Sequence, residues 1–393
     1  MKILIVSAAY PPYASGVATA TANLADYLSR SHQLALIAGG NYKTPQRKRI
    51  NNNFILYLFP GVQIKRQKAA LTIPYPYPKK ILALITSFQP DVIHLQDVAP
   101  MSLTVLNLAR KLKIPAVMTH HFTAEFIVKT LISGQNLSNI LSNSRLTQQL
   151  IYRLVNLFYN HCDLLTVPNP NLIPYFQKAG LTTPVMAIPN GIHLKNFKRR
   201  LKLKHILTKY QIAQPKIILY VGRLDVDKNI DILMDAFRLV HQYNPAASLV
   251  LVGDGNKKPQ LLNQTKKLNL LDCVYFLGKI DNSDSTLSHL YNAATVFASA
   301  SIIENQSVAF IEAMAAGLPI VSAKTAITVN SNLNGLEFEP GNAGALAVCL
   351  QKILIDQKLR KTISKYNRHA GRQYDIAITS RQYLKAYQSL KTI

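Results

Sequence analysis

The sequence contains no tryptophan, only three cysteines and few acidic residues. Cys162, Cys273 and Cys349 stand far apart without metal-ligand spacing, which excludes a disulfide framework and a cysteine-based zinc site. We expect them to be reduced core thiols. No apolar run approaches the roughly 20 residues of a membrane-spanning helix, and the apolar start of the chain meets Pro11 and Pro12 too early for a signal peptide. Any membrane contact is therefore expected to be peripheral.

The shortage of acidic residues leaves a formal net charge of +26, from 45 Lys and Arg against 19 Asp and Glu. This excess favours phosphate-rich partners, namely nucleic acid, nucleotides or an anionic membrane surface. It is spread along the chain, because residues 1–195 already carry 19 basic and 5 acidic side chains. Local clusters lie at Lys43–Arg49, Lys65–Lys68 and Lys195–Lys204. Each cluster taken singly also fits a solvated surface.

Length and pattern together predict an α/β protein of two domains. The 393 residues exceed what one hydrophobic core usually serves, and 48% of them are hydrophobic. Short β-branched runs alternate with amphipathic stretches, as in βα units that form parallel sheets. The basic stretch from Lys195 to about Gln214 separates two such series. The expected strands are Lys2–Ser7, Leu34–Ala38, Ile55–Phe59, Asp91–Leu95, Ala116–Thr119, Leu164–Val167 and Val185–Ile188, then Lys216–Val221, Ser248–Val252, Val274–Leu277, Thr295–Ala298 and Leu318–Ser322.

Two glutamates stand eight positions apart in SASIIENQSVAFIEAMAAGLPIVS, at Glu304 and Glu312, in a chain that has only five. If a helix begins near Gln306, Glu304 lies in the loop before it and Glu312 about two turns inside it. The first carboxylate could accept hydrogen bonds from sugar hydroxyls and the second from vicinal ribose hydroxyls. The spacing also fits a surface helix whose N-terminal carboxylate is favoured by the helix dipole.

Two cations follow an expected strand in YVGRLDVDKNI. Arg223 and Lys228 would lie at the carboxyl end of that strand, where open α/β sheets bind ligands, and a diphosphate would suit them. Two solvated loop cations are the alternative. Asp225 and Asp227 form an Asp-x-Asp pattern, but we interpret them as cap and loop residues and expect no metal.

Glycines and histidines mark three further strand ends. Gly16, in YPPYASGVATATA, permits close approach of a phosphate to a helix N-terminus, although a plain turn needs the same residue. Gly253, in VGDG, fits either backbone contact with a nucleotide or a tight turn. His121, in THHFTAEF, follows a strand beside His120 and could donate a hydrogen bond to a sugar hydroxyl. A packed or exposed histidine pair is the alternative, and no zinc-type spacing accompanies it.

In this order the motifs resemble the retaining glycosyltransferases with the GT-B fold, the family of bacterial glycogen synthase-like, phosphatidylinositol mannosyltransferase and diacylglycerol glucosyltransferase enzymes. The resemblance runs from YPPYASGVATAT through DVIHLQ, TVPNPNLIPYF and IPNGI to YVGRL, LVGDG, YFLGKI, the glutamate pair and AAGLPIV. It implies two Rossmann-like domains facing each other across a cleft. Residues 1–195 would form the acceptor- and membrane-facing domain and residues 196–371 the donor domain. A C-terminal helix, about 372–393, would cross back to the first domain.

The resemblance also implies roles for individual residues. Arg223 and Lys228 would bind the donor diphosphate, Glu312 the ribose and Glu304 the transferred sugar, and Gly16 would add a backbone contact from the opposite domain. The donor-binding set it implies is Gly16, Arg223, Lys228, Gly253, Gly278, Lys279, Glu304, Asn305, Gln306, Ser307 and Glu312. Within it, the backbone at Gly278 and Lys279 would read the base. The catalytic set would be His121, Glu304, Arg223 and Lys228, with His121 and Glu125 on the acceptor side.

Retention of configuration would follow from a front-face reaction in which the departing diphosphate helps to deprotonate the acceptor hydroxyl. Such a reaction requires no metal. It requires no cofactor either, since the nucleotide sugar, with a UDP-sugar such as UDP-glucose favoured, is a co-substrate. Two positions depart from the family pattern. Ser307 stands where a glycine is usual, which affects sugar preference, and His193 after IPNGI replaces a more usual acidic residue.

The acceptor implied is a membrane lipid such as diacylglycerol. His121 with Glu125, and the Glu-x-Gln form at Glu304, look most like the diacylglycerol glucosyltransferases. The charge agrees, because basic clusters would hold a cytoplasmic enzyme peripherally on the anionic inner face of the cell membrane. Two alternatives remain: a soluble or cell-wall or exopolysaccharide precursor as acceptor, and a non-catalytic nucleic-acid-binding protein. The latter rests on charge alone, and without a recognition module we expect no nucleic-acid partner.

Overall fold

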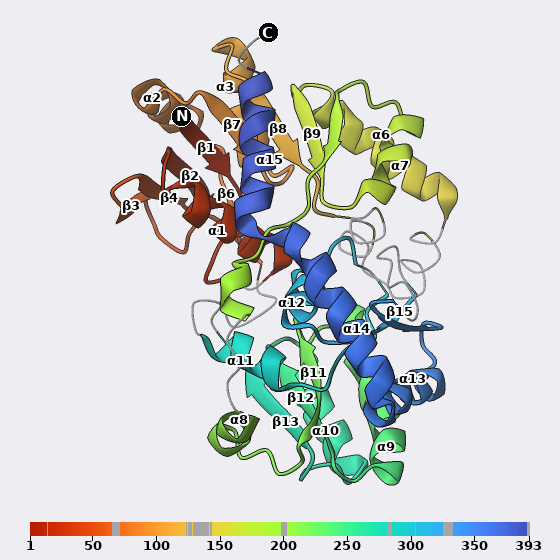
Figure 1. Ribbon diagram of the computed structural model, residues 1–393. Helices are drawn as coiled ribbons and strands as arrows, with labels where there is room; N and C mark the ends of the chain where they lie inside the picture. Colours follow the sequence, from red (N-terminus) through yellow and green to blue (C-terminus); the bar gives the residue numbers. More distant parts are fainter. Residues whose placement is uncertain are drawn as a thin grey trace. The chain divides into compact units, whose positions relative to one another are not determined.

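The computed structural model describes residues 1–13, 15–64, 71–122, 124, 128, 141, 144–197, 203–302 except 281–284, 304–324 and 333–390 (Figure 1). The chain forms two compact units. The first runs to Gly191 and takes up the chain again at Ile376, and the second is Ile192–Asp375. The last helix, α15 (Ile376–Ser389), therefore belongs to the first unit although it follows the whole of the second in sequence.

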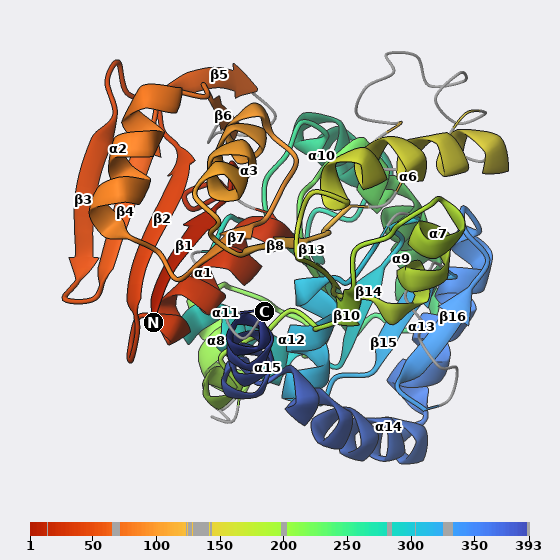
Figure 2. The same ribbon diagram turned by 90° about the horizontal axis from the view of Figure 1, so that it is seen from above.

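A mostly parallel sheet of eight strands forms the centre of the first unit, in the order β10-β9-β8-β7-β1-β2-β4-β3 (Figure 2). Only the β3–β4 pair within it is antiparallel. A separate antiparallel hairpin is formed by β5 and β6. The strands are β1 (Lys2–Val6), β2 (Gln33–Gly39), β3 (Gln46–Asn51), β4 (Phe54–Phe59), β5 (Gly61–Ile64), β6 (Leu71–Pro74), β7 (Val92–Leu95), β8 (Ala116–Thr119), β9 (Leu164–Val167) and β10 (Val185–Ala187).

Helices cover both faces of this sheet because alternate strand residues point to opposite sides. On one side Ile3 and Ile5 of β1 pack in one cluster with α1 and α15. On the other, Leu4 and Val6 pack with the remaining helices of the unit. The helices are α1 (Gly16–Leu28), α2 (Pro78–Phe88), α3 (Pro100–Lys111), α6 (Arg145–Tyr159), α7 (Ile173–Lys178) and α15, with the short η1 (Pro170–Leu172).

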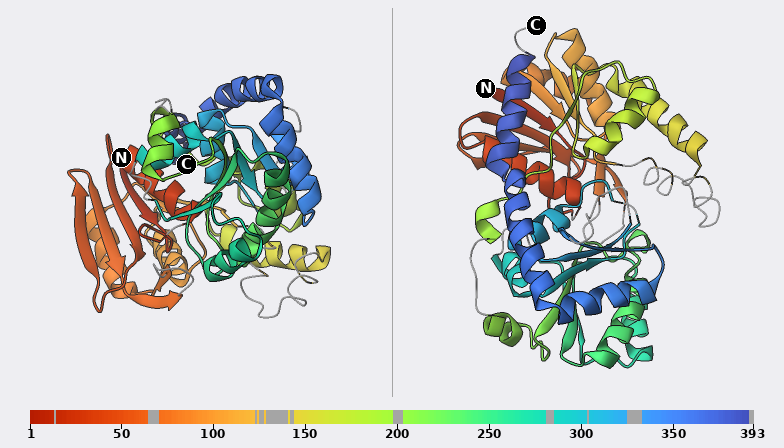
Figure 3. Two further views of the ribbon diagram at one scale, coloured as in Figure 1. Left: turned by 90° about the horizontal axis from the view of Figure 1, so that it is seen from below. Right: turned by 45° about the vertical axis from the view of Figure 1, so that its right-hand side comes forward.

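The second unit has a fully parallel sheet of six strands, in the order β13-β12-β11-β14-β15-β16 (Figure 3). Its main core lies where α9, α10, α13 and α14 meet that sheet. The strands are β11 (Lys216–Val221), β12 (Ala247–Val252), β13 (Val274–Gly278), β14 (Val296–Ser299), β15 (Ile320–Ala323) and β16 (Gly335–Phe338). The helices are η2 (Leu194–Phe197), α8 (Leu203–Lys209), η3 (Val226–Lys228), α9 (Ile230–Tyr243), α10 (Lys258–Lys267), α11 (Ser285–Ala293), α12 (Val308–Ala316), α13 (Ala343–Ile355), α14 (Gln357–Ala370) and η4 (Gly371–Tyr374).

All twelve predicted strands are present, with ends that differ by two residues or fewer. The prediction missed β3, β5, β6 and β16. Strand β3 (QRKRIN) has five exposed positions and carries part of the basic cluster Lys43–Arg49, so its sequence lacks the apolar alternation of a buried strand. The predicted helix after Gln306 begins at Val308, as α12. One expectation was wrong: Cys349 is only half-buried, whereas Cys162 and Cys273 are buried.

Candidate functional site

The predicted donor-site residues of the second unit follow four neighbouring strands. Arg223 follows β11, Gly253 follows β12, Gly278 ends β13, and Glu304 lies beyond β14. The sheet order places these strands side by side as β13, β12, β11 and β14, all parallel. Their carboxyl ends therefore meet at one edge of the sheet, which is where open α/β sheets bind ligands.

Glycine backbones line this edge at close range. The Gly222 amide donates to the Val252 carbonyl at 3.0 Å, and the Gly253 amide donates to the Gly278 carbonyl at 2.8 Å. Gly253 has φ +141°, and a Cβ there would lie 1.8 Å from the carbonyl oxygen of Gly222. Gly278 has φ +70°, and a Cβ there would meet nothing within 4 Å. At Gly222, Gly253 and Gly278 the three strand ends thus approach one another with no side chain between them. The backbone at Gly278 has open space beside it.

The two predicted phosphate-binding cations are held by carboxylates. Arg223 forms ion pairs with Asp225 and, at 3.0 Å, with Asp227. Lys228 Nζ lies 2.8 Å from Glu304 Oε1 and 3.4 Å from Asp227 Oδ2. Asp225 and Asp227 are therefore more than the cap and loop residues we expected, because they orient both cations. The Asp225 side chain makes no cap hydrogen bond to η3.

Burial and neighbouring charges act in opposite directions on the pKa values of Lys228 and Asp227, and the neighbouring charges prevail. Burial by itself would lower the pKa of Lys228, but the carboxylates of Glu304 and Asp227 outweigh it and raise that pKa. Burial likewise opposes ionisation of Asp227, yet the positive charges of Lys228 and Arg223 hold its pKa below the ordinary value. Lys228 and Asp227 are therefore both charged at neutral pH, and the Lys228 cation is held at the strand ends.

The two glutamates of the pair have different partners. Glu304 bonds to Lys228, whereas Glu312 lies inside α12, is 7% exposed, and accepts a hydrogen bond from the Tyr291 hydroxyl at 2.8 Å. Burial raises the pKa of Glu312 to about 7, although the Tyr291 hydrogen bond acts to lower it. Between them, the predicted residues Asn305 and Gln306 form a half-buried turn. Ser307 is the N-cap of α12 but makes no side-chain cap bond.

In the first unit, the predicted His121 lies at the end of β8 beside the end of β7. Its Nε2 lies 2.7 Å from Oε1 of Gln96, which follows β7. Because a side-chain amide oxygen only accepts, Nε2 is the protonated nitrogen and Nδ1 is left as an acceptor. Burial lowers the pKa of His121 to about 4, so the ring is neutral at pH 7. In this tautomer Nδ1 can accept a hydrogen bond from a hydroxyl but cannot donate one. From the sequence we had instead expected His121 to donate a hydrogen bond to a sugar hydroxyl.

His120 has a different role from His121, which sequence alone did not separate. Its ring is 1% exposed, packs edge-on against Phe176 at 4.7 Å between centroids, and bonds to the Tyr159 hydroxyl at 2.7 Å. It is a core residue. Glu125, the predicted acceptor-side carboxylate, lies outside the described residues.

Three residues that sequence reasoning did not assign contact the predicted ones, and a fourth contacts one of these three. Gln96 bonds to His121, Tyr291 to Glu312, Ser301 to Lys228, and His94 to Gln96 at 3.0 Å. Gln96 and His94 stand in the DVIHLQ motif, so the position of that motif at a strand end was an available signal. Ser301 stands just after β14 in the stretch SASIIENQSVAF, so its place at a strand end was also an available signal. Tyr291 had none, because its partner is 21 residues away.

Gly16 and Lys279 are the remaining predicted residues. Gly16 is the first residue of α1, whose N-cap Ser15 accepts a hydrogen bond from the Ala18 amide at 3.1 Å. It therefore stands at a helix N-terminus, as the motif indicated. Lys279 is exposed directly after Gly278. Among the described residues, no group of three or more His, Cys, Asp or Glu is arranged to hold a metal ion.

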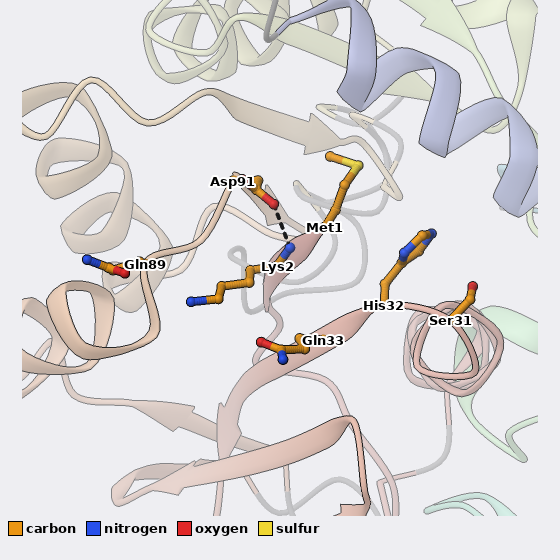
Figure 4. A pocket seen from close by; sticks show the side chains of 7 residues that line it. All are labelled: Met1, Lys2, Ser31, His32, Gln33, Gln89 and Asp91. Atoms are coloured by element: carbon orange, nitrogen blue, oxygen red, sulfur yellow. Dashed lines mark hydrogen bonds between the residues drawn. The ribbon is translucent and has the colours of Figure 1, made fainter.

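A depression of about 550 Å³ lies away from all these residues. Its lining consists of Met1, Lys2, Ser31, His32, Gln33, Gln89 and Asp91, where the Lys2 amide donates to Asp91 at 2.7 Å (Figure 4). These residues stand at or before the starts of β1, β2 and β7. Because ligands of parallel sheets bind at the carboxyl ends of the strands, we do not regard this depression as the functional site.

Comparison with known proteins agrees with the two-unit architecture. Residues 14–196 match the family Glycosyltransferase Family 4, and residues 205–370 match the family Glycosyl transferases group 1. The alpha-monoglucosyldiacylglycerol synthase of Streptococcus pneumoniae is 28% identical over 327 residues, covering 82% of this chain and 71% of that protein. Within the described ranges, no helix combines the length and hydrophobicity needed to cross a membrane.

Solved structures match over nearly the whole chain. HepE of Anabaena in complex with UDP and glucose is 18% identical with a TM-score of 0.75, covering 99% of this chain and 100% of that one. The sucrose-phosphate synthase of Thermosynechococcus elongatus is 22% identical with a TM-score of 0.77, covering 99% and 98%. Parallel sheets in two units, the site at the strand ends and both family matches lead to one assignment. The chain belongs to the group 1 glycosyltransferases and has the GT-B fold.

Proposed function

We propose that this protein transfers a hexose from a nucleotide sugar, with UDP-glucose favoured, to a membrane lipid such as diacylglycerol, with retention of configuration. The observation that carries the proposal is the charged cluster of Arg223, Lys228 and Glu304 at the carboxyl ends of β11 and β14. It combines two cations for a diphosphate with a carboxylate for sugar hydroxyls in a partly buried place. A nucleotide sugar needs both.

In this proposal the carboxylates hold the cations until the donor binds. Arg223 and Lys228 would contact the diphosphate, and Glu304 would exchange its bond with Lys228 for hydroxyls of the transferred sugar. Asn305, Gln306 and Ser307 would continue that contact from the turn before α12. Glu312, buried but able to ionise near pH 7, would accept both ribose hydroxyls.

Backbone groups would recognise the rest of the donor. The open backbone at Gly278, with Lys279 and Gly253 beside it, would contact the base. The N-terminus of α1 at Gly16 would offer amide groups to a phosphate, since the first amides of a helix have no partner within it.

The chemistry would depend on charge and position. As the bond between the sugar and the diphosphate breaks, negative charge grows on the leaving group, and Arg223 and Lys228 would stabilise it. The same leaving group would take the proton of the attacking hydroxyl on the same face of the sugar, which gives retention. Neutral His121 would accept a hydrogen bond at Nδ1 and orient the acceptor together with Glu125. These steps use no metal ion.

Support for donor and acceptor comes from the relatives. The Anabaena structure holds UDP and glucose, and the pneumococcal relative is named for monoglucosyldiacylglycerol. The net charge of +26 also suits an anionic membrane. The basic cluster Lys43–Arg49 lies largely on the exposed strand β3, whereas Lys65–Lys68 and residues 198–202 lie outside the described residues. We propose peripheral association with the inner face of the cell membrane.

A donor and acceptor screen tests the proposal. Release of UDP or GDP would be measured from a panel of nucleotide sugars, with diacylglycerol vesicles, with soluble sugar acceptors, and with neither. We expect UDP release that depends on lipid, and a glycolipid product with retained anomeric configuration. Turnover with a soluble acceptor only would replace the lipid by a cell-wall or exopolysaccharide precursor. Failure of every nucleotide sugar to react or bind would contradict the transferase itself.

A further inference from the structure

Helix α6 (Arg145–Tyr159) has four leucines on its solvent side. Leu146, Leu150, Leu154 and Leu157 are 78%, 56%, 53% and 68% exposed. Their spacing of four, four and three residues places them on one stripe, because positions three and four apart share a helix face. Single exposed leucines are ordinary on a protein surface, but a contiguous stripe of them marks a contact surface.

The charge along this stripe has one sign. The other exposed positions of the helix are Arg145, Gln149 and Arg153, and the helix contains no Asp or Glu. Leucines flanked by arginines, without any carboxylate, make a surface that is apolar along its centre and basic at its border.

The opposite side of α6 is fixed in the core, so the exposure of the leucines does not result from a loosely attached helix. The Tyr159 hydroxyl bonds to His120 at 2.7 Å, and the Asn156 side chain donates to the Phe176 carbonyl at 3.0 Å. Ser144 caps the helix by accepting from the Thr147 amide at 3.4 Å. The helix is therefore anchored on one face and presents the leucine stripe on the other.

We propose that the leucine stripe of α6 lies on an anionic lipid bilayer, with the leucines at the boundary of the acyl chains and Arg145 and Arg153 at the headgroups. A bilayer supplies an apolar plane and negative charge together. The apolar plane complements the leucines, and the negative charge complements the arginines. With 15 residues α6 is about 22 Å long, which suits a helix lying in the interface rather than crossing it. The function of this contact, to bring the enzyme to a lipid acceptor, rests on the proposed function. The contact itself can be tested by vesicle binding, without measuring sugar transfer.

The stripe and the basic strand β3 are separate surfaces. Helix α6 lies beside β9 and α7 at one end of the first unit, and β3 forms the last strand at the other end (Figure 1). Between the outermost strands β10 and β3 are seven strand spacings, roughly 34 Å. A probe on each surface can therefore report which one enters the lipid.

Because the chain has no tryptophan, the fluorescence of a single introduced tryptophan reports on its own position alone. Leu150→Trp would carry the only tryptophan of the chain, and Ile50→Trp on β3, at a position 51% exposed, is the matched probe in the same unit. Tyr243→Trp, at a position 81% exposed, serves for the second unit. With vesicles of phosphatidylglycerol and phosphatidylcholine, we expect the emission of Leu150→Trp to shift to shorter wavelength and to be quenched by brominated lipid. Tyr243→Trp should not respond in this way. Ile50→Trp lies beside the basic cluster Lys43–Arg49, which would meet headgroups and not acyl chains, so it should shift and be quenched less than Leu150→Trp.

Replacing leucines of the stripe by glutamate should weaken vesicle binding. We expect Leu150→Glu with Leu157→Glu to weaken vesicle binding roughly tenfold or more, because two apolar contacts are lost and two negative charges face the headgroups. Leu271→Glu, at a position 58% exposed in the second unit, should leave vesicle binding unchanged. All four tested leucine and tyrosine positions are exposed, so circular dichroism should show unaltered folding.

Three results would overturn the inference. The first is absence of vesicle binding by the unaltered protein. The second is vesicle binding during which the Leu150→Trp emission stays unchanged, because another surface would then carry the contact. The third is an emission shift that needs no lipid and grows with protein concentration, which would identify a second copy of the chain as the occupant. Vesicle binding through α6 without sugar transfer would contradict the proposed function and leave this inference intact.

Discussion

Gln96 Oε1 lies 2.7 Å from Nε2 of His121 and thereby sets the tautomer of that histidine. The bond is the first of a buried chain, since Gln96 Nε2 lies 3.0 Å from His94 Nε2, and His94 Nδ1 lies 2.7 Å from the Tyr387 hydroxyl of α15. With neutral rings, each group donates to the next, from His121 to the C-terminal helix. Burial, then the nearby His121, lowers the pKa of His94 to about 3, which keeps the chain of hydrogen bonds neutral.

Gln96 is accordingly expected to act as a positioning residue. In Gln96→Leu we expect kcat to fall roughly ten- to a hundredfold, because His121 can then rotate or change tautomer, while the donor Kd stays unchanged. Steady-state kinetics and calorimetric UDP binding would measure the two effects. Gln264→Leu, which removes a half-buried glutamine bonded to Asp235 in the second unit, is the control. An equal loss of donor affinity in Gln96→Leu would contradict the positioning role.

The ion pair of Lys228 with Glu304 predicts coupled losses of activity. Lys228→Ala and Glu304→Gln should each lower kcat by about 10²–10³, the usual effect of removing one stabilising group from a transition state. Because the two side chains contact each other, the double variant should lose less than the product of the single losses. Kinetics of the four proteins would show this. The control is Lys324→Ala, which breaks an exposed ion pair with Glu339 and should have the kcat of the wild type. An unchanged kcat in Lys228→Ala would contradict the assignment of this residue to the active site.

Glu312 predicts a dependence of stability on pH. Its pKa is about 7 in the folded protein and 4.5 as the ordinary value, so the folded state holds the proton more tightly. The resulting stabilisation is present below pH 4.5 and is lost as pH rises to 7, by about 3 kcal/mol for this group. Urea unfolding between pH 4.5 and 8 would compare wild type with Glu312→Gln, in which this contribution should vanish. Identical pH profiles for the two proteins would show that the group is not buried as described.

The same carboxyl predicts a dependence of donor binding on pH. Only the ionised form accepts two ribose hydroxyls, so UDP affinity should rise as pH increases through about 7. Tyr291→Phe removes the hydrogen bond that lowers this pKa and should move the midpoint to higher pH. Calorimetric titration with UDP at several pH values would measure it. A midpoint that stays in place, or moves downward, would contradict the assigned contact.

Gly253 predicts a strong effect of adding one methyl group. In Gly253→Ala the new Cβ would lie 1.8 Å from the Gly222 carbonyl oxygen at φ +141°, so the strand ends must separate, at a cost of about 2 kcal/mol or more. Gly344→Ala near the start of α13 meets only Asn342, at 3.5 Å, and should instead stabilise by roughly 0.5–1 kcal/mol. Thermal unfolding of both variants gives the comparison. Equal melting temperatures would mean that the close approach relaxes without strain.

Patterns along the chain predicted the repeating part of the fold well. Short apolar runs such as KIILYV, set between longer amphipathic stretches, favour buried parallel strands, and all twelve predicted strands were found. Strand β3 was missed because QRKRIN is exposed at five of six positions, so its pairing with β4 leaves little trace in hydrophobicity. Strand β16 was missed because its sequence, GLEF, has no β-branched residue and includes a glycine and a glutamate, so it does not look like a buried strand.

Sequence order also indicated where ligand-binding residues would gather. Motifs that follow strands in a parallel sheet must lie at its carboxyl edge, so the places of Arg223, Gly253 and Gly278 along the chain suffice to group them. What the motifs could not supply was the partners of these groups. Asp225 and Asp227 were assigned to the loop, because the spacing of charges in a loop does not show which of them form ion pairs. Tyr291 was assigned to nothing, because a hydrogen bond to a residue 21 positions away leaves no periodic signal.

The sequence by itself determined the α/β class, two series of strands, and the residue types offered to a diphosphate and a sugar. These depend on local hydrophobic spacing and on strand ends, which a linear pattern records. Only the tertiary structure decided that His121 is neutral with Nδ1 as acceptor, that Glu312 titrates near pH 7, and that the leucines of α6 face outward. Those properties depend on burial and on contacts between distant segments, which exist only once the chain has packed.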